Sequence, residues 1–303
     1  MKVTVYQTSP RLLDVKGNLE DVISKIHRAR EKGSHLAVFP ELALTGYFVR
    51  DRYHEAALRL DSNEIKSLAA ASKGTAAVVG FIEESPSMNF YNSALVLVDG
   101  SIVFASRKLV LPNYGVFEEG KIFSAGKQIC TFTLGGFHIA VYICNDMWHP
   151  SLPNLGITQK ADIFVTLFNS SQGSMGSEFS NIETWGIINT FYSRIFGIYN
   201  ICANRVGEEF VNSWRRKESS TCSLEETEAC STTGTGSSYR FWGGSEIVNP
   251  FGKTICKAAL HETDEIEAHI SRDLLRQKKI LLPYVKSDDP YFTYRELKRV
   301  LFK

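Results

Sequence analysis

The sequence has few cysteines, and their spacing does not form a metal site or a disulfide framework. They form no Cys-x-x-Cys pair and no Cys/His cluster at the spacing of a zinc site. We therefore expect reduced thiols and no metal or other cofactor. The six cysteines are Cys130, Cys144, Cys202, Cys222, Cys230 and Cys256.

Excess charge of one sign and long apolar runs are also missing. A net charge of +1 over 303 residues gives no electrostatic footprint for nucleic acid or for an anionic membrane surface. The N-terminus enters an alternating strand pattern without an apolar leader, and no stretch approaches the length of a membrane span. These absences predict a cytoplasmic protein that acts on a small molecule and binds neither nucleic acid nor membrane.

The chain alternates apolar runs of strand length with amphipathic helical segments, which predicts an α/β fold. A strand at 3–7, a helix at 17–32 and a strand at 36–40 make a β-α-β opening. Composition shows no break, so we expect one domain over 1–303. Further helices are expected at 52–73, after Pro150 and at 178–196, and further strands at 76–82, within 94–104 on both sides of an Asp-Gly turn, and at 129–134, 138–143, 162–167, 198–203, 244–249, 253–258 and 264–270.

One segment, at about 208–240, does not follow this alternation. It is rich in Ser, Thr, Glu and Gly and carries the basic run Arg215-Arg216-Lys217. Loops of this length without structure of their own are uncommon in compact domains. We interpret it as an inserted loop that is either disordered or serves as a lid or an interface.

Three ionisable residues lie at or just beyond the ends of predicted strands, namely Glu41, Lys108 and Cys144. Taken singly, they suit a solvated turn carboxylate, a surface cation and a buried thiol, since free cysteine is among the most buried residue types. Taken together, they supply a base, a cation and a nucleophile.

The motifs around these residues resemble those of the nitrilase, or carbon-nitrogen hydrolase, superfamily, whose signature is a Glu-Lys-Cys triad in this chain order. The matching motifs are FPELALTGY at 39–47, RKLVLP at 107–112, NYGVFEEGKIFSAG at 113–126 and CNDMW at 144–148, supported by NSA at 92–94, NRVG at 204–207 and FWGGSEIVNPFG at 241–252. The resemblance implies a four-layer α-β-β-α sandwich with mixed sheets, and a homodimer or higher homo-oligomer formed through helices.

The resemblance also implies roles for individual residues. Glu41, Lys108 and Cys144 are then catalytic, with Glu119 as an additional glutamate. Glu41 is expected to take the thiol proton, and Lys108 and the backbone N–H of Asn145 to stabilise the charge that develops on the substrate. The residues expected to contact substrate are Tyr47, Tyr114, Asn145 and Asn169; for the two tyrosines, ordinary half-buried packing is the competing interpretation.

Within the superfamily, the chain is most similar to the glutaminase domain of glutamine-dependent NAD synthetase, but it departs from that branch. No pyrophosphate-binding loop of the synthetase type follows, which predicts a freestanding hydrolase. The arginine that would hold the carboxylate of glutamine is absent from 176–181. An unpaired carboxylate in a pocket is costly, so we expect a neutral or amine-bearing substrate and poor use of glutamine. Aromatic residues near the motifs favour an apolar acyl group; they are Tyr47, Tyr114, Phe168, Phe179 and Trp185.

The leading hypothesis is therefore an amidase that cleaves a non-peptide C–N bond of a small carboxamide or N-acyl compound through a cysteine thioester. A nitrilase, which converts a nitrile to an acid and ammonia, is the alternative within the enzymes. A catalytically silent interaction protein that uses the 208–240 segment for docking is the alternative outside them, and the presence of all three triad residues argues against it.

Overall fold

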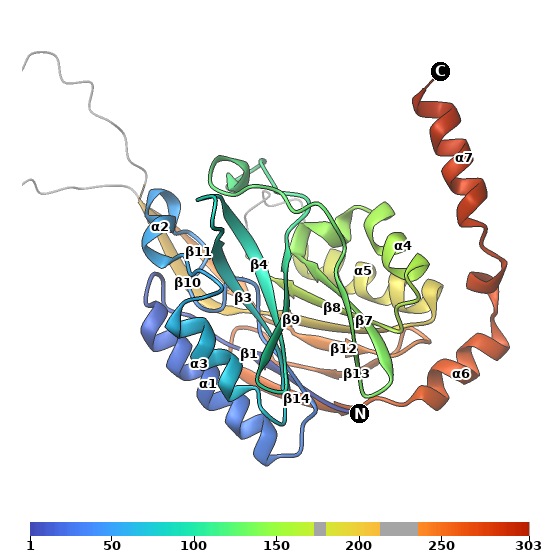
Figure 1. The fold of residues 1–303 in the computed structure, drawn as a ribbon, viewed down its shortest axis with the longest axis horizontal. Helices are drawn as coiled ribbons and strands as arrows, with labels where there is room; N and C mark the ends of the chain where they lie inside the picture. The colour runs from blue at the N-terminus through green and yellow to red at the C-terminus, as the bar shows by residue number, and fades with distance from the viewer. Residues whose placement is uncertain (173–179, 213–235, 303) are drawn as a thin grey trace, which may run out of the picture.

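The computed structural model describes residues 1–172, 180–212 and 236–302, and its strands form two six-stranded mixed sheets (Figure 1). The first sheet has the order β14 (Asp264–His269), β1 (Lys2–Gln7), β2 (Leu36–Val38), β3 (Ala76–Glu84), β4 (Phe90–Val98) and β5 (Ser101–Arg107). The second has the order β13 (Thr254–Lys257), β12 (Glu246–Val248), β9 (Tyr199–Asn204), β8 (Ile163–Phe168), β7 (Phe137–Ile143) and β6 (Thr131–Leu134).

Side chains alternate between the two faces of each strand. Apolar layers therefore form between the two sheets and between each sheet and the helices that cover it. In β8, Ile163, Val165 and Leu167 enter the core between the two sheets, whereas Phe164 and Phe168 enter the core between sheet and helices. This follows from the two-residue period of a strand, because both faces of each sheet are covered.

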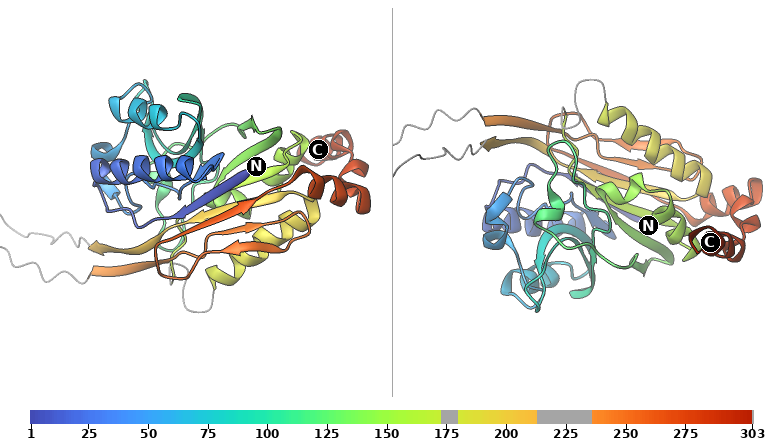
Figure 2. Two further views of the ribbon diagram at one scale, coloured as in Figure 1. Left: turned by 90° about the horizontal axis from the view of Figure 1, so that it is seen from below. Right: turned by 90° about the horizontal axis from the view of Figure 1, so that it is seen from above.

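Helices cover the two outer faces of the pair of sheets (Figure 2). Helices α1 (Val15–Glu31) and α3 (Asn63–Ala71) pack on the first sheet, and α4 (Ser151–Thr158) and α5 (Asn181–Phe196) pack on the second. The expected four-layer α-β-β-α sandwich with mixed sheets is confirmed. The expected Asp-Gly turn also joins β4 to β5, with Asp99 and Gly100 both at positive φ, 47° and 81°.

The single helix expected at 52–73 is wrong, because the structure divides it. A short turn η1 (Arg50–Arg52) and α2 (Tyr53–Ala56) precede an extended stretch, and α3 begins only at residue 63. Leu58 exchanges backbone hydrogen bonds with the edge of β3, and the side chain of Ser62 accepts the N–H of Ile65 as the N-cap of α3.

The segment expected to be an inserted loop at 208–240 is structured at both ends. Strands β10 (Val206–Asn212) and β11 (Gly236–Trp242) pair antiparallel as a separate two-stranded ribbon. A composition averaged over the whole segment hides these ends, where Glu209 is buried. Residues 213–235, to which the expected disorder, lid or docking role belongs, lie outside the described residues.

The C-terminal part forms α6 (Arg272–Leu281), a turn η4 (Tyr284–Ser287) and α7 (Pro290–Leu301), none of which the sequence patterns predicted. Helix α7 has no buried residue and stands apart from the sandwich (Figure 1). Across the described ranges, no helix has the length and apolar character needed to cross a membrane.

Candidate active site

The three residues that the sequence places at strand ends come together across the two sheets. Lys108 follows β5 directly and Glu41 lies just beyond β2, both in the first sheet. Cys144 follows β7 of the second sheet and begins the turn η3 (Cys144–Trp148). The site is therefore assembled from both halves of the sandwich.

Cys144 has a backbone conformation that is rare for a residue with a side chain. Its φ is +46°, in the left-handed region, at the sharp change from strand to turn. Such strain persists where the surroundings enforce it, and it is frequent at functional sites. The turn places Cys144, a residue of intermediate exposure, at the end of a strand whose preceding residues are buried.

Lys108 is buried, with 1% of its side chain exposed, and it is held by two carboxylates. Its Nζ donates to Oε1 of Glu41 at 2.8 Å and to Oε1 of Glu119 at 2.7 Å. Burial alone would lower the pKa of Lys108, but the charges of Glu119 and Glu41 outweigh burial and raise the pKa well above its ordinary value. The ammonium is therefore permanently charged at physiological pH.

Glu119 lies in the turn η2 (Glu119–Lys121), and its carboxylate accepts from three donors, one of which is Nδ2 of Asn92 at 3.5 Å from Oε2. Besides Lys108, the hydroxyl of Tyr47 donates to Oε1 of Glu119 at 2.6 Å. Burial and the nearby charge of Glu41 raise the pKa of Glu119, while Lys108 opposes the rise. The contact places Tyr47 beside Glu119; its predicted contact with substrate stays a prediction.

Cys144 is held as a neutral thiol when no substrate is bound. Burial is the largest cause that raises its pKa well above the ordinary value, and the negative charge of Glu41 adds to it, while Lys108 and the backbone N–H of Asn169 act in the opposite direction. A thiol in this state needs a base during attack, because the thiolate is the nucleophilic form.

Glu41, whose charge acts on Cys144, has one carboxylate oxygen that no described residue engages. Glu41 is fully buried, and its Oε1 is occupied by Lys108 and by Nδ2 of Asn92, at 2.7 Å for the second contact. Its Oε2 has no hydrogen-bond partner among the described residues. A buried carboxylate oxygen without a donor is unusual, and it leaves capacity for a proton or a substrate group.

The expected substrate-binding residues are also near the thiol. Tyr114, 44% exposed, donates its hydroxyl to Oδ1 of Asn145 at 2.9 Å, and Nδ2 of Asn145 donates to the carbonyl of Val110. Asn169 is buried, and neither of its side-chain polar atoms has a partner within the described parts of the chain. Its amide is therefore available to a bound polar group.

Asp146 is a residue of the site whose role the sequence did not reveal. Its Oδ1 accepts the N–H groups of Leu109 and Val110, both at 2.9 Å, and its Oδ2 accepts the N–H of Ile143 at 3.1 Å. It thus joins the segment after Lys108 to the segment before Cys144. Burial raises the pKa of Asp146 to about 7, although these hydrogen bonds act to lower it. The motifs NSA and CNDMW contain Asn92 and Asp146, but only the structure gives their partners.

A cavity of about 790 Å³ lies beside Tyr47 and Glu119. Aromatic and charged residues contribute equally to its walls. The wall includes Phe48, Tyr53, Phe123 and Tyr239 together with Arg50, Asp51, Glu118 and Lys121. The sequence predicts Phe168 and Trp185 near an apolar acyl group. Their rings instead stack on each other in the core between the second sheet and α5, with 4.2 Å between the ring centroids. Phe179 lies outside the described residues.

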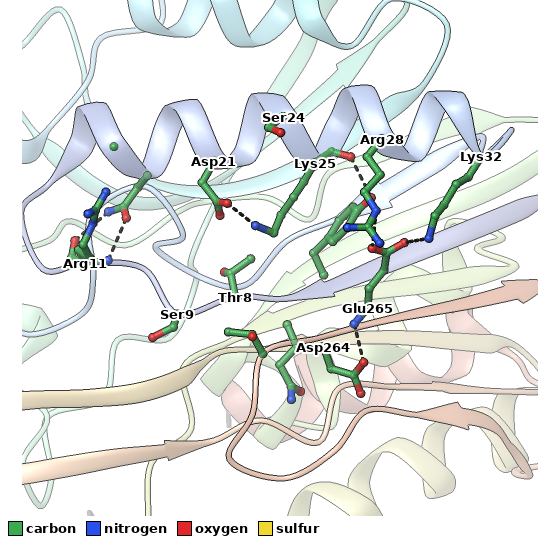
Figure 3. A pocket seen from close by; sticks show the side chains of 15 residues that line it. Thr8, Ser9, Arg11, Asp21, Ser24, Lys25, Arg28, Lys32, Asp264 and Glu265 are labelled. Carbon is green, nitrogen blue, oxygen red and sulfur yellow. Dashed lines mark hydrogen bonds and ion pairs between the residues drawn. The ribbon is translucent and has the colours of Figure 1, made fainter.

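A second cavity, of about 800 Å³, lies between α1 and β14 and shares no residue with the predicted site (Figure 3). Its cations are already paired with carboxylates, since Lys25 contacts Asp21, and Arg28 and Lys32 contact Glu265. In the parts of the chain that the structure covers, no group of three or more His, Cys, Asp or Glu residues could hold a metal ion.

Residues 2–280 match the family model of the carbon-nitrogen hydrolases, so the chain belongs to the carbon-nitrogen hydrolase family. Among curated proteins it is similar to glutamine-dependent NAD(+) synthetase of Thermotoga maritima, with 35% identity over 161 residues. That match covers 52% of this chain and 28% of the synthetase, so the chain corresponds to well under half of that relative.

Solved structures of the family share the fold. A carbon-nitrogen hydrolase from Helicobacter pylori G27 has a TM-score of 0.76 at 21% identity, covering 98% of this chain and 97% of that one. An amidase from Nesterenkonia sp. AN1 has a TM-score of 0.71 at 18% identity, covering 98% and 99%. At these identities the likeness establishes the architecture.

Proposed function

We propose that the protein is an amidase that hydrolyses the C–N bond of a small carboxamide or N-acyl compound through a thioester on Cys144. The observation that carries this proposal is the unoccupied Oε2 of the buried Glu41, in a site whose thiol is neutral at rest. Glu41 is the base, Lys108 the cation and Glu119 the residue that orients Lys108.

In acylation, the sulfur of Cys144 bonds to the carbonyl carbon while its proton passes to Glu41. The oxyanion that forms is stabilised by Lys108 and by the backbone N–H of Asn145. Glu41 then returns the proton to the amide nitrogen, the C–N bond breaks, and ammonia or an amine leaves a thioester behind.

In deacylation, Glu41 takes a proton from water while the water oxygen bonds to the thioester carbon. The C–S bond breaks, the sulfur recovers a proton from Glu41, and the carboxylic acid leaves. Lys108 remains charged throughout because the two glutamates hold its proton. Tyr47, Tyr114, Asn145 and Asn169 are proposed to orient the substrate, and the free amide of Asn169 supports this role.

The proposed substrate is an uncharged amide with an apolar or aromatic acyl group, which suits the aromatic residues in the walls of the cavity beside Tyr47. Glutamine is the second candidate. It is favoured by the glutamine-dependent relative, and the cavity wall includes the cations Arg50 and Lys121, of which Lys121 already pairs with Glu118.

The experiment is intact-mass analysis after incubation with amides, nitriles, N-acyl amines and glutamine, followed by kcat/KM for each compound that reacts. The amidase proposal expects an acyl adduct on Cys144 and release of ammonia or amine from an amide. Turnover of nitriles alone makes the protein a nitrilase, and no adduct or turnover with any compound overturns the enzymatic proposal. Cys144→Ser is the control that must lose the adduct.

A further inference from the structure

We propose that Glu209 is a positioning residue, through which the β10–β11 ribbon holds Tyr47 against Glu119. Its relevance to catalysis rests on the proposed function, but the contacts themselves do not. Glu209 lies on β10, far from the triad in sequence, and is 3% exposed.

The carboxylate of Glu209 receives two backbone N–H groups from the loop that follows Glu41. The N–H of Tyr47 lies 3.0 and 3.2 Å from its two oxygens, and the N–H of Phe48 lies 2.8 Å from Oε2. Hydrogen bonds from an N–H to a buried carboxylate are among the strong ones. They fix the backbone at the residue whose hydroxyl reaches Glu119.

A buried cation completes the environment of Glu209. Arg205, 1% exposed, pairs with Glu209 and donates Nη2 to the carbonyl of Pro10 at 3.0 Å. Its guanidinium also lies over the ring of Phe241, 4.2 Å from the centroid, and so spans both strands of the ribbon. Every hydrogen-bonding or ion-pairing group of the described chain that contacts the carboxylate is therefore a donor.

The loop is shaped to let this carboxylate approach. Gly46 has a φ of +78°, and a Cβ placed on it would lie 2.9 Å from Oε1 of Glu209. The aromatic rings on both sides add to the contact, because Tyr47 packs against Phe241 and Phe48 against Tyr239. The ribbon thus forms one wall of the cavity and fixes the position of Tyr47 at the same time.

The consequence is a continuous chain of contacts from the ribbon to the triad. Glu209 fixes the backbone of Tyr47, the Tyr47 hydroxyl binds Glu119, and Glu119 binds Lys108. Loss of the carboxylate would free the loop and remove a donor from Glu119. The loss of Glu209 should therefore act through Tyr47, and its effect should not add to the effect of losing the Tyr47 hydroxyl.

The test is a double-mutant cycle of Glu209→Gln and Tyr47→Phe, each assayed for kcat and KM and for the pH dependence of Cys144 alkylation by iodoacetamide. We expect each single variant to lower kcat about tenfold, and the double variant to lose little more than the worse single variant, because both changes remove one interaction. We also expect both to shift the alkylation profile of Cys144 in the same direction.

Glu209→Asp covers the case in which Glu209→Gln does not fold, because it keeps a charge beside Arg205 but is too short to reach both N–H groups. Glu246→Gln is the matched control, a buried carboxylate on β12 that contacts Asn189, and its turnover should stay within about twofold of wild type. A hundredfold, additive loss in the double variant, or unchanged kcat and alkylation in both Glu209 variants, overturns the inference. If no compound is turned over but the alkylation profiles shift together, the proposed function fails and the positioning role stands.

Discussion

At the scale of single residues, the site depends on which group carries a proton at rest. Glu41 raises the pKa of the Cys144 thiol by its charge, and it is also the proposed acceptor of the thiol proton. These two effects are separable. Replacement of Glu41 by glutamine removes the negative charge and the base together. Loss of the charge favours ionisation of Cys144, whereas loss of the base lowers turnover.

We therefore expect Glu41→Gln to lower the pKa of Cys144 while reducing kcat by roughly 100- to 10,000-fold, the range for loss of a general base. Lys108 then acts on the thiol with less opposition. The pH midpoint of iodoacetamide alkylation, mapped to Cys144 by mass spectrometry, gives the first quantity, and steady-state kinetics gives the second. A midpoint that moves upward contradicts the assigned electrostatics.

Asp146 gives a second prediction at this scale, concerning stability and pH. Its pKa rises from an ordinary 3.8 to about 7 in the folded protein. Because the folded state binds this proton more tightly, the stabilisation from Asp146 is complete below pH 3.8 and is lost as the pH rises toward 7. A rise of this size corresponds to about 4 kcal/mol at most.

Asp146→Asn cannot titrate at this position, so the stability advantage of wild type over this variant should shrink between pH 4 and pH 8 by up to about 4 kcal/mol. Urea unfolding of both proteins across this range measures the difference. An advantage that grows with pH would mean that the folded protein instead favours the carboxylate.

At the scale of elements, caps and strand ends decide where the chain changes direction. Ser62 marks the point at which the expected long helix is interrupted and α3 begins. We expect Ser62→Ala to destabilise the protein by about 1 kcal/mol with little effect on turnover, because only the N–H of Ile65 loses its acceptor. Ser67→Ala, in the interior of the same helix, is the control and should be neutral or slightly stabilising.

The sequence predicts the elements that carry the triad because each is a local pattern. Apolar runs end at Ile143 and near Lys108, and the residues that follow are displayed at the sheet ends. The ribbon and its anchor could not be predicted in this way. Glu209 meets Tyr47 across 162 residues of sequence, and nothing local to either residue indicates the contact. The two contacts that Asp146 makes with Leu109 and Val110 likewise depend on how the two sheets face each other.

At the scale of the whole molecule, apolar side chains on the outer face of α5 remain uncovered. Ile187, Phe191 and Ile195 recur every fourth residue and are 61%, 50% and 41% exposed. A contiguous apolar stripe on a helix is typical of an interface. We propose, as the family resemblance implies, that two copies of the chain associate through this face.

Phe191→Asp should shift the protein toward monomer, because a charge in the centre of the stripe would be buried by association. Light scattering coupled to size exclusion measures the mass. Met88→Asp is the control, since Met88 is 74% exposed in the turn between β3 and β4, away from α5. An unchanged mass for Phe191→Asp would place the contact elsewhere or leave the chain monomeric.

Because the site is divided between the two sheets, catalysis depends on how the two sheets are positioned relative to each other. Glu41 and Lys108 follow strands of the first sheet and Cys144 follows a strand of the second, so the apolar layer between the sheets, together with the hydrogen bonds of Asp146, sets the distance from base to sulfur. The side chains of Val38, Val141 and Val165 lie in this layer and set the spacing between the two sheets. A misplacement of about 1 Å can cost about a hundredfold in rate, so substitutions in this apolar layer are restrained by chemistry as well as by folding.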